Sequence, residues 1–145
     1  MPPITSPKRE VNAVRILLAG LAAGVSSTVI CLFYKIVYTH YTGFSMDEFV
    51  NAGTITLACL AGAALAAMGF FLLSKAMSNP QTVFVFVVFL LMCASLLVPL
   101  SPTLPDRTTR PDDFTLLTLP MHVFAGIIIT YLIPTIAGSP KLVYK

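Results

Sequence analysis

The chain of 145 residues is 57% hydrophobic and 10% charged, and its mean hydropathy is +0.87. This composition lies well outside that of soluble globular proteins. The charged residues leave four uncharged stretches, at 16–34, 49–74, 76–105 and 114–140. Because a membrane-spanning helix needs about 20 apolar residues, each stretch can cross a bilayer once and none can cross it twice. The composition excludes a soluble catalytic domain, a disordered chain and a single-pass anchor with a large head.

The first uncharged stretch follows Lys8, Arg9 and Arg15, an arrangement that also begins secretory signal peptides. Residues 16–34 are longer than the apolar region of a signal peptide, which spans about 7–15 residues. We therefore expect a retained helix over 13–38. The polar and proline-rich segment before it, residues 1–12, is expected to be a flexible cytoplasmic arm.

Two further helix starts are marked by capping residues. Ser45-Met-Asp-Glu48 has the spacing of a capping box, in which the serine and glutamate side chains satisfy backbone amides at the helix start. It predicts a helix that starts near Met46 and covers 46–76. Ser78-Asn-Pro80 offers a cap followed by proline at the first helical position, where the missing N–H costs nothing. It predicts a helix over 80–98.

Prolines and an acidic pair separate the last two helices. Because Pro99, Pro102 and Pro105 disfavour a continuing helix, we expect an extended loop over 99–111. Asp112-Asp113 suits the positive end of a helix dipole and predicts a last helix over 114–137. The chain 1–145 is thus expected to be a single integral membrane domain, an all-α, four-transmembrane-helix bundle built from two hairpins.

The distribution of Lys and Arg predicts the orientation, because cytoplasmic loops retain basic residues. With the N-terminus inside, the inner segments hold six basic residues and one acidic residue, whereas the outer loops hold three basic and five acidic residues. Both termini are therefore expected to be cytoplasmic. The net charge of +3 is then a topology signal and an attraction to anionic lipid, and no basic cluster is dense enough to bind nucleic acid.

Small residues predict where the helices approach each other closely. Gly20 and Gly24 have the GxxxG spacing in the first helix. The second helix carries small residues at the same spacing, namely Ala58, Gly62 and Ala66, with Gly69 beyond them. We expect these two series to pack against each other. The third helix is bulky on all sides over 83–92 and is expected to be the most exposed to lipid.

Few residues offer chemistry. No Asp, Glu, Lys or Arg lies deep inside a predicted span, and a proton-coupled carrier or an ion pathway normally needs one. Cys31, Cys59 and Cys93 stand alone in three helices without a CxxC motif, so they favour buried apolar packing over a disulfide exchanger or a zinc site. We expect neither an enzyme nor a metal site.

His122 is the one polar residue that stands out, because it lies about 12 Å along the last helix from Phe114. A stripe of polar and small residues runs along the same helix face and is expected to face the first two helices: Thr115, Thr118, His122, Gly126 and Thr130. Pro120 frees the carbonyl of Leu116. We expect His122 to hydrogen-bond that carbonyl or a neighbouring helix. The alternatives are a contact to a quinone or lipid headgroup, and a haem or chlorin ligand, for which His40 is the only candidate second histidine.

Two motifs resemble a family of small bacterial four-helix membrane proteins of unknown function. They are Ser-Leu-Leu-x-Pro-Leu, at Ser95–Leu100, and Met121-His122 followed by the distal Pro134. Pro120, directly before Met121, departs from the pattern. The resemblance covers the last two helices best. It implies a four-helix fold and a home in the bacterial cytoplasmic (inner) membrane, and it implies no activity.

Together these features predict a structural or accessory membrane protein, a subunit or partner of a larger membrane assembly. Its short loops leave mainly its membrane-facing flanks for other proteins or for a second copy. A small-solute transporter or exporter that acts as an oligomer is the second expectation, since four helices alone rarely enclose a pathway. A subunit that binds haem or a chlorin through His122 is the third.

Overall fold

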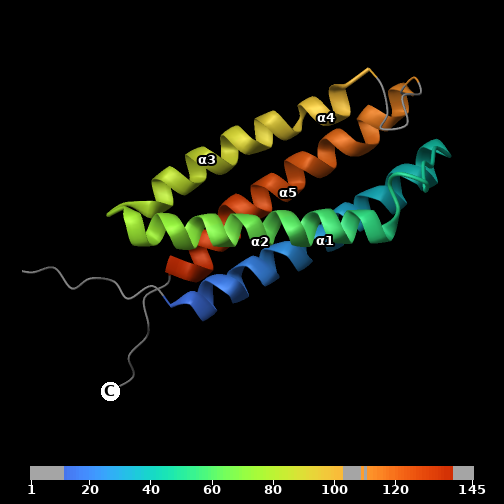
Figure 1. Cartoon of the computed structure of the whole chain (residues 1–145). Coiled ribbons are helices and arrows are strands. Elements are labelled where there is room, and N and C mark those ends of the chain that lie inside the picture. The colour runs from blue at the N-terminus through green and yellow to red at the C-terminus, as the bar shows by residue number, and fades with distance from the viewer. Residues whose placement is uncertain (1–11, 103–108, 110, 139–145) are drawn as a thin grey trace, which may run out of the picture.

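The computed structural model describes residues 12–102, 109 and 111–138, and all elements of this part of the chain are helices. They form an elongated bundle (Figure 1). The elements are α1 (Ala13–Thr42), α2 (Ala52–Ala76), α3 (Pro80–Ser95), α4 (Leu97–Leu100) and α5 (Asp112–Gly138). Because α3 and α4 together make one span, four helical segments are long and apolar enough to cross a membrane. The predicted all-α four-helix membrane fold is therefore confirmed. The expected arm before the first helix lies almost entirely outside the described residues.

The first helix extends beyond its predicted end at residue 38 and stops at Thr42. Its start is capped by Asn12, whose side chain accepts a hydrogen bond from the amide of Val14 at 3.0 Å. It ends at Gly43, which has φ = 71°, and the amide of Gly43 bonds the carbonyl of Thr39 at 2.9 Å. A left-handed residue of this kind is the common way to end a helix, and only glycine adopts it without strain. The helix therefore continues to the first residue that can end it.

The second helix starts later than predicted, at Ala52 instead of near Met46. The capping box is made by Asn51 and Thr54: the Asn51 side chain accepts from the Thr54 amide at 2.9 Å, and the Thr54 hydroxyl accepts from the Asn51 amide at 3.0 Å. Residues 47–49 form a turn. There Asp47 makes an ion pair with Lys35 of α1. This ion pair links the turn that precedes α2 to α1.

The third span begins at Pro80, as predicted, although the Asn79 side chain makes no capping hydrogen bond. The expected break before Pro99 is wrong. The helix is interrupted at Leu96 and resumes in α4, with Pro99 buried as its third residue. A proline is tolerated there because the first amides of a helix have no helical partner. The carbonyl of Pro99 accepts a hydrogen bond from the Thr115 hydroxyl at 3.1 Å, which fastens α4 to α5.

The last span, α5, begins two residues earlier than predicted, with Asp112 and Asp113 inside its first turn. It contains Pro120 and Pro134. It extends to Gly138, one residue beyond the predicted end at 137, and most of the preceding loop, 103–108 and 110, lies outside the described residues.

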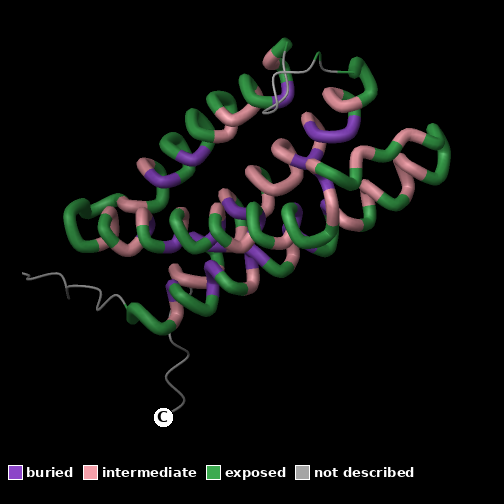
Figure 2. Tube along the Cα trace, turned by 45° about the vertical axis from the view of Figure 1, so that its right-hand side comes forward, coloured by how far each residue is buried: buried purple, intermediate pink, exposed green. Residues whose placement is uncertain are grey.

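Helix α1 packs along both α2 and α5, whereas α3 contacts only the edges of α2 and α5 and has no such contact with α1. Buried residues lie where the helices face one another (Figure 2). They form two clusters along the bundle. One cluster, around Phe70, Phe84 and Ile133, lies towards the end that holds the α2–α3 connection. The other, around Cys31, Ile55 and Leu117, lies towards the opposite end.

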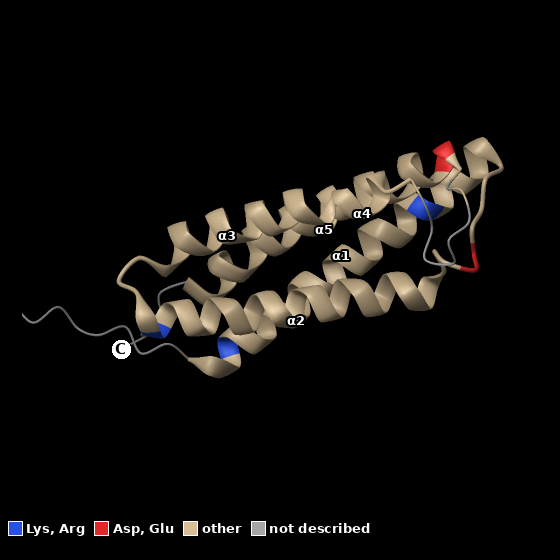
Figure 3. Ribbon diagram, turned by 45° about the horizontal axis from the view of Figure 1, so that its top comes forward, with Lys and Arg blue, Asp and Glu red and all other residues tan. Residues whose placement is uncertain are grey.

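The outer surface of the bundle is apolar, as contact with lipid requires. The third span has the smallest buried share, 17% of its most apolar window against 28–44% for the others, which agrees with the expected lipid exposure of this helix. The charges gather at the two ends (Figure 3). Arg15 and Lys75 lie at the end where α1 begins and α2 ends, and the acidic residues that the structure describes lie at the other end, together with Lys35.

Candidate functional site

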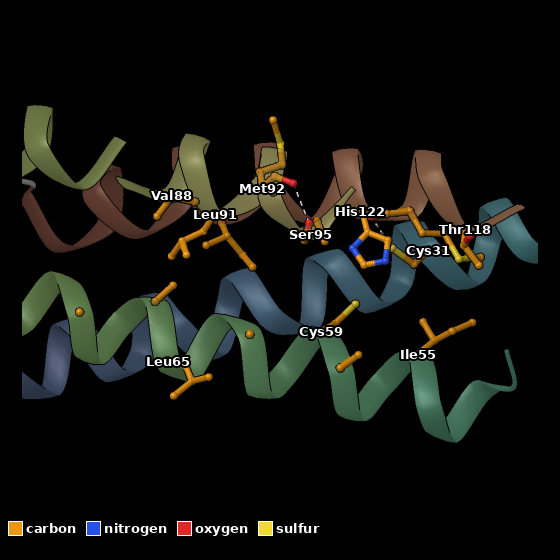
Figure 4. A pocket seen from close by; sticks show the side chains of 18 of the residues that line it. Cys31, Ile55, Cys59, Leu65, Val88, Leu91, Met92, Ser95, Thr118 and His122 are labelled. Atoms are coloured by element: carbon orange, nitrogen blue, oxygen red, sulfur yellow. Dashed lines mark hydrogen bonds between the residues drawn. The ribbon is translucent and has the colours of Figure 1, made fainter. Parts of the chain in front are cut away.

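A cavity of about 590 Å³ lies between α2, α3 and α5. Its walls come mainly from these three helices, and α1 contributes Cys31 (Figure 4). On α2 the lining runs from Thr54 to Leu73, most of the length of the helix. The cavity is therefore a long slot parallel to the helices. The cavity is present because α3 contacts α2 and α5 but does not contact α1.

The wall on α2 includes the series of small residues that was predicted to pack against the first helix. Ala58, Gly62, Ala66 and Gly69 line the cavity. A Cβ placed on Gly62 or Gly69 would meet no atom within 4 Å, so these glycines provide space and no helix contact. Their expected role in packing against Gly20 and Gly24 is therefore wrong.

The close approach of α1 and α2 uses another face of α2. A Cβ on Gly20 would lie 2.6 Å from the Cβ of Ala67, and a Cβ on Gly24 would lie 3.2 Å from that of Ala63. Ala63 and Ala67 are buried. On α5, a Cβ on Gly126 would lie 2.5 Å from the Met92 sulfur of α3, so Gly126 admits that side chain. Small residues thus occur on two faces of α2, one for packing and one for the cavity.

His122 is half-buried on α5 and lines the cavity, where its ring extends towards α2 (Figure 4). It does not bond the carbonyl that Pro120 frees. The hydroxyl of Tyr34 on α1 donates to that carbonyl, on Leu116, at 2.8 Å. Among the described residues His122 makes no hydrogen bond, so the expected hydrogen-bond partner is wrong. The ring lies at the cavity and its nitrogens have no protein partner there. The packing of α1 along α5 brings Tyr34 to the Leu116 carbonyl, and no local sequence pattern indicates this tertiary contact.

The polar stripe of α5 divides between two environments. Thr118 and His122 line the cavity together with Gly126. Thr115 bonds Pro99 of α4, and Thr130 donates to the Gly126 carbonyl in its own helix at 2.6 Å. The stripe therefore faces α3, α4 and the cavity. The expected contact with α1 is wrong for this face, because α1 meets α5 through buried residues such as Leu117 and Met121, whereas α2 faces the stripe across the cavity.

Two cysteines that look isolated in the sequence lie together. Cys31 and Cys59 are both free and buried, and they belong to the same buried cluster, to which α1 contributes one cysteine and α2 the other. The Cys31 thiol also donates to the carbonyl of Met121 at 3.6 Å. Sequence reasoning missed this pair because α1 and α2 meet through Gly20 and Gly24. No local motif shows which residues of α2 these glycines contact. Cys93 on α3 is exposed and separate from them.

The histidines do not come together as a haem site needs. Cys31 is level with Met121, the neighbour of His122. His40 follows Cys31 by nine residues on α1, which places it about 14 Å further along the bundle. It is exposed there and packs against the ring of Tyr41. No group of three or more His, Cys, Asp or Glu side chains suited to a metal ion occurs within the described part of the chain.

Comparison with protein-family models, with curated proteins and with solved structures finds no match to this chain. The resemblance carried by Ser95–Leu100 and Met121-His122 therefore stays a prediction. The site has to be interpreted from its own geometry.

Proposed function

We propose that this protein is an accessory membrane protein, not an enzyme, that holds one chain-shaped lipophilic molecule in the cavity between α2, α3 and α5. The observation that carries the proposal is the shape of the cavity. From Thr54 to Leu73 the lining extends over about 28 Å of α2. Over that length a volume of 590 Å³ corresponds to a cross-section of about 21 Å², close to that of one extended hydrocarbon chain.

The chemistry of the lining supports a lipophilic occupant. Among the residues that the structure describes, no Asp, Glu, Lys or Arg side chain lines the cavity, and most of the lining residues are aliphatic or aromatic. An ionic group would lose its hydration there without gaining a partner, which costs several kcal/mol. A hydrocarbon chain has no dehydration cost on moving from the bilayer into such a slot, because it exchanges van der Waals contacts with lipid for contacts with the walls.

The position of the opening supports access from the bilayer. Leu65 on α2 and Leu91 on α3 both line the cavity, and they are 64% and 62% exposed. The slot is therefore open between α2 and α3, on the flank that carries no further helix of the bundle. This flank faces lipid or a membrane partner, either a second copy or a subunit of a larger assembly.

The location follows from the charges. The end with Arg15 and Lys75 is proposed to be cytoplasmic, because basic residues remain on that side. Both termini would then be cytoplasmic, in the inner membrane of a bacterium, as the resemblance implies. Solute transport is less well supported, because a polar solute needs polar groups along its whole path, and one half of this cavity has only apolar side chains.

Filling the α2 wall tests the proposal. Gly62→Leu with Gly69→Leu places side chains in open space, so the fold and thermal stability are expected to persist while the cavity is filled. The matched control is Ala61→Leu with Ala64→Leu, on exposed positions of α2 outside the cavity. Native mass spectrometry after extraction in mild detergent measures retained lipophiles. We expect retention in the wild type and the control and its loss in the filled variant. Equal retention in all three proteins would refute the proposal.

A further inference from the structure

The cavity is polar in one half and apolar in the other. Its side chains with polar atoms lie towards the end where α2 and α5 begin: Cys31, Thr54, Cys59, Ser95, Thr118 and His122. Towards the other end the lining consists of apolar residues such as Leu73, Phe84 and Ile129. A molecule that matches both halves has a polar group at one end and an apolar tail at the other.

Most of these polar side chains already use their hydrogens. The hydroxyls of Thr54, Ser95 and Thr118 each donate to backbone carbonyls of their own segment, at 2.7–3.0 Å. The Cys31 thiol donates to the Met121 carbonyl, and the Cys59 thiol interacts with Cys31. These groups offer a ligand acceptor atoms at most.

His122 is the exception among the described lining residues, since it makes no hydrogen bond and its ring extends into the cavity (Figure 4). A histidine ring carries at least one N–H in either protonation state. The free donor in the cavity is thus an imidazole N–H, and its natural partner is an acceptor atom on the ligand.

The remaining length of the cavity indicates a long tail. His122 follows Met121, whose carbonyl contacts Cys31, and Cys31 belongs to the same buried cluster as Cys59 on α2. His122 is therefore approximately level with Cys59. From Cys59 to Leu73 the α2 wall continues for about 21 Å. This wall is apolar and open at Gly62 and Gly69.

We infer that the ligand is a neutral lipid with a carbonyl-bearing headgroup, of the quinone class, whose carbonyl oxygen accepts a hydrogen bond from His122 and whose tail lies along α2 towards Leu73. This inference rests on the proposed function and specifies it. The headgroup is uncharged, because the described lining includes no Asp, Glu, Lys or Arg side chain to pair with a charge. A phospholipid would have only its acyl chain in the slot and would make no use of His122.

The test compares two probes in protein reconstituted into phosphatidylcholine nanodiscs. One is a benzoquinone with a saturated alkyl tail, and the other is the alkylbenzene with the same tail, which lacks the carbonyl oxygens. The wild type is expected to bind the quinone about tenfold more tightly, the value of one hydrogen bond of about 1.4 kcal/mol. His122→Leu removes the donor and is expected to abolish this preference, whereas His122→Gln keeps a donor and retains most of it.

The outcomes separate this inference from the proposed function. If the wild type binds both probes equally, or if His122→Leu keeps the preference, the assigned headgroup contact is wrong while the lipophilic cavity stands. If neither probe binds the wild type better than the variant filled at Gly62 and Gly69, both proposals fail. Should His122→Leu not fold, the His122→Gln variant and the ratio of the two wild-type affinities still decide.

Discussion

The hydrogen bond from Tyr34 to the Leu116 carbonyl replaces a helical bond that Pro120 cannot make. Tyr34→Phe removes the hydroxyl and keeps the ring, which packs edge-on against Phe124 at a centroid distance of 5.6 Å. The carbonyl of Leu116 then has neither a helical nor a side-chain donor. Polar contacts between membrane helices contribute about 0.6–2 kcal/mol, so we expect a loss of about 1 kcal/mol in the free energy of unfolding.

The dependence on Pro120 gives this prediction its test. Pro120→Ala restores an amide that bonds the Leu116 carbonyl within α5. In that background Tyr34→Phe leaves the carbonyl with a partner, and its cost is expected to fall close to zero. The double-mutant cycle should therefore give a coupling of about 1 kcal/mol between the two positions.

Reversible unfolding of the four proteins by titration with dodecyl sulfate, in mixed micelles with dodecylmaltoside, measures the cycle. Helical circular dichroism and protection of the buried Cys31 thiol provide two independent probes. An equal loss for Tyr34→Phe in both backgrounds would refute the reasoning, since the hydroxyl would then act independently of the proline.

Two further predictions test the packing and the orientation. Gly20→Leu should lower the free energy of unfolding by at least about 2 kcal/mol, because a Cβ at this position would already lie 2.6 Å from the Cβ of Ala67 on α2. Gly62→Leu should change the free energy of unfolding little, because its side chain enters open space. Equal losses of stability in thermal denaturation would contradict the assignment of one face of α2 to packing and the other to the cavity. In a background without native cysteines, a cysteine at Thr109 should react with a membrane-impermeant maleimide from the outer side and one at Ser78 should not, and the opposite pattern would reverse the proposed topology.

The number and position of the spans could be predicted because they depend on local composition. Uncharged length alone located the four helices, and most of their ends were within a few residues. The largest error concerned the start of α2, where Ser45–Glu48 and Asn51–Thr54 both offer capping side chains. Choosing between them required the position of Asp47 beside Lys35, which is a tertiary contact.

The site was harder to predict, because it depends on which face of each helix meets which neighbour. Helix α2 carries small residues at positions 58, 62 and 66 and also at 63 and 67, so either series satisfies the rule for close packing. The register against Gly20 and Gly24 selects the second series and leaves the first for the cavity. The single notable histidine could be identified from the sequence. The absence of its expected hydrogen bond could not be predicted, because the Leu116 carbonyl is occupied by Tyr34, a tertiary contact from another helix.

The opening between Leu65 and Leu91 determines how occupancy of the cavity has to be expressed. A ligand that arrives sideways from the bilayer is dissolved in lipid, so the relevant variable is its mole fraction in the membrane and not its concentration in the aqueous phase. Adding empty vesicles at constant total ligand should lower the mole fraction of ligand in the membrane and so lower the occupancy of the cavity. Enlarging the buffer volume should leave the occupancy unchanged. A competing lipid species would act at the same opening, so the membrane composition itself would regulate this protein.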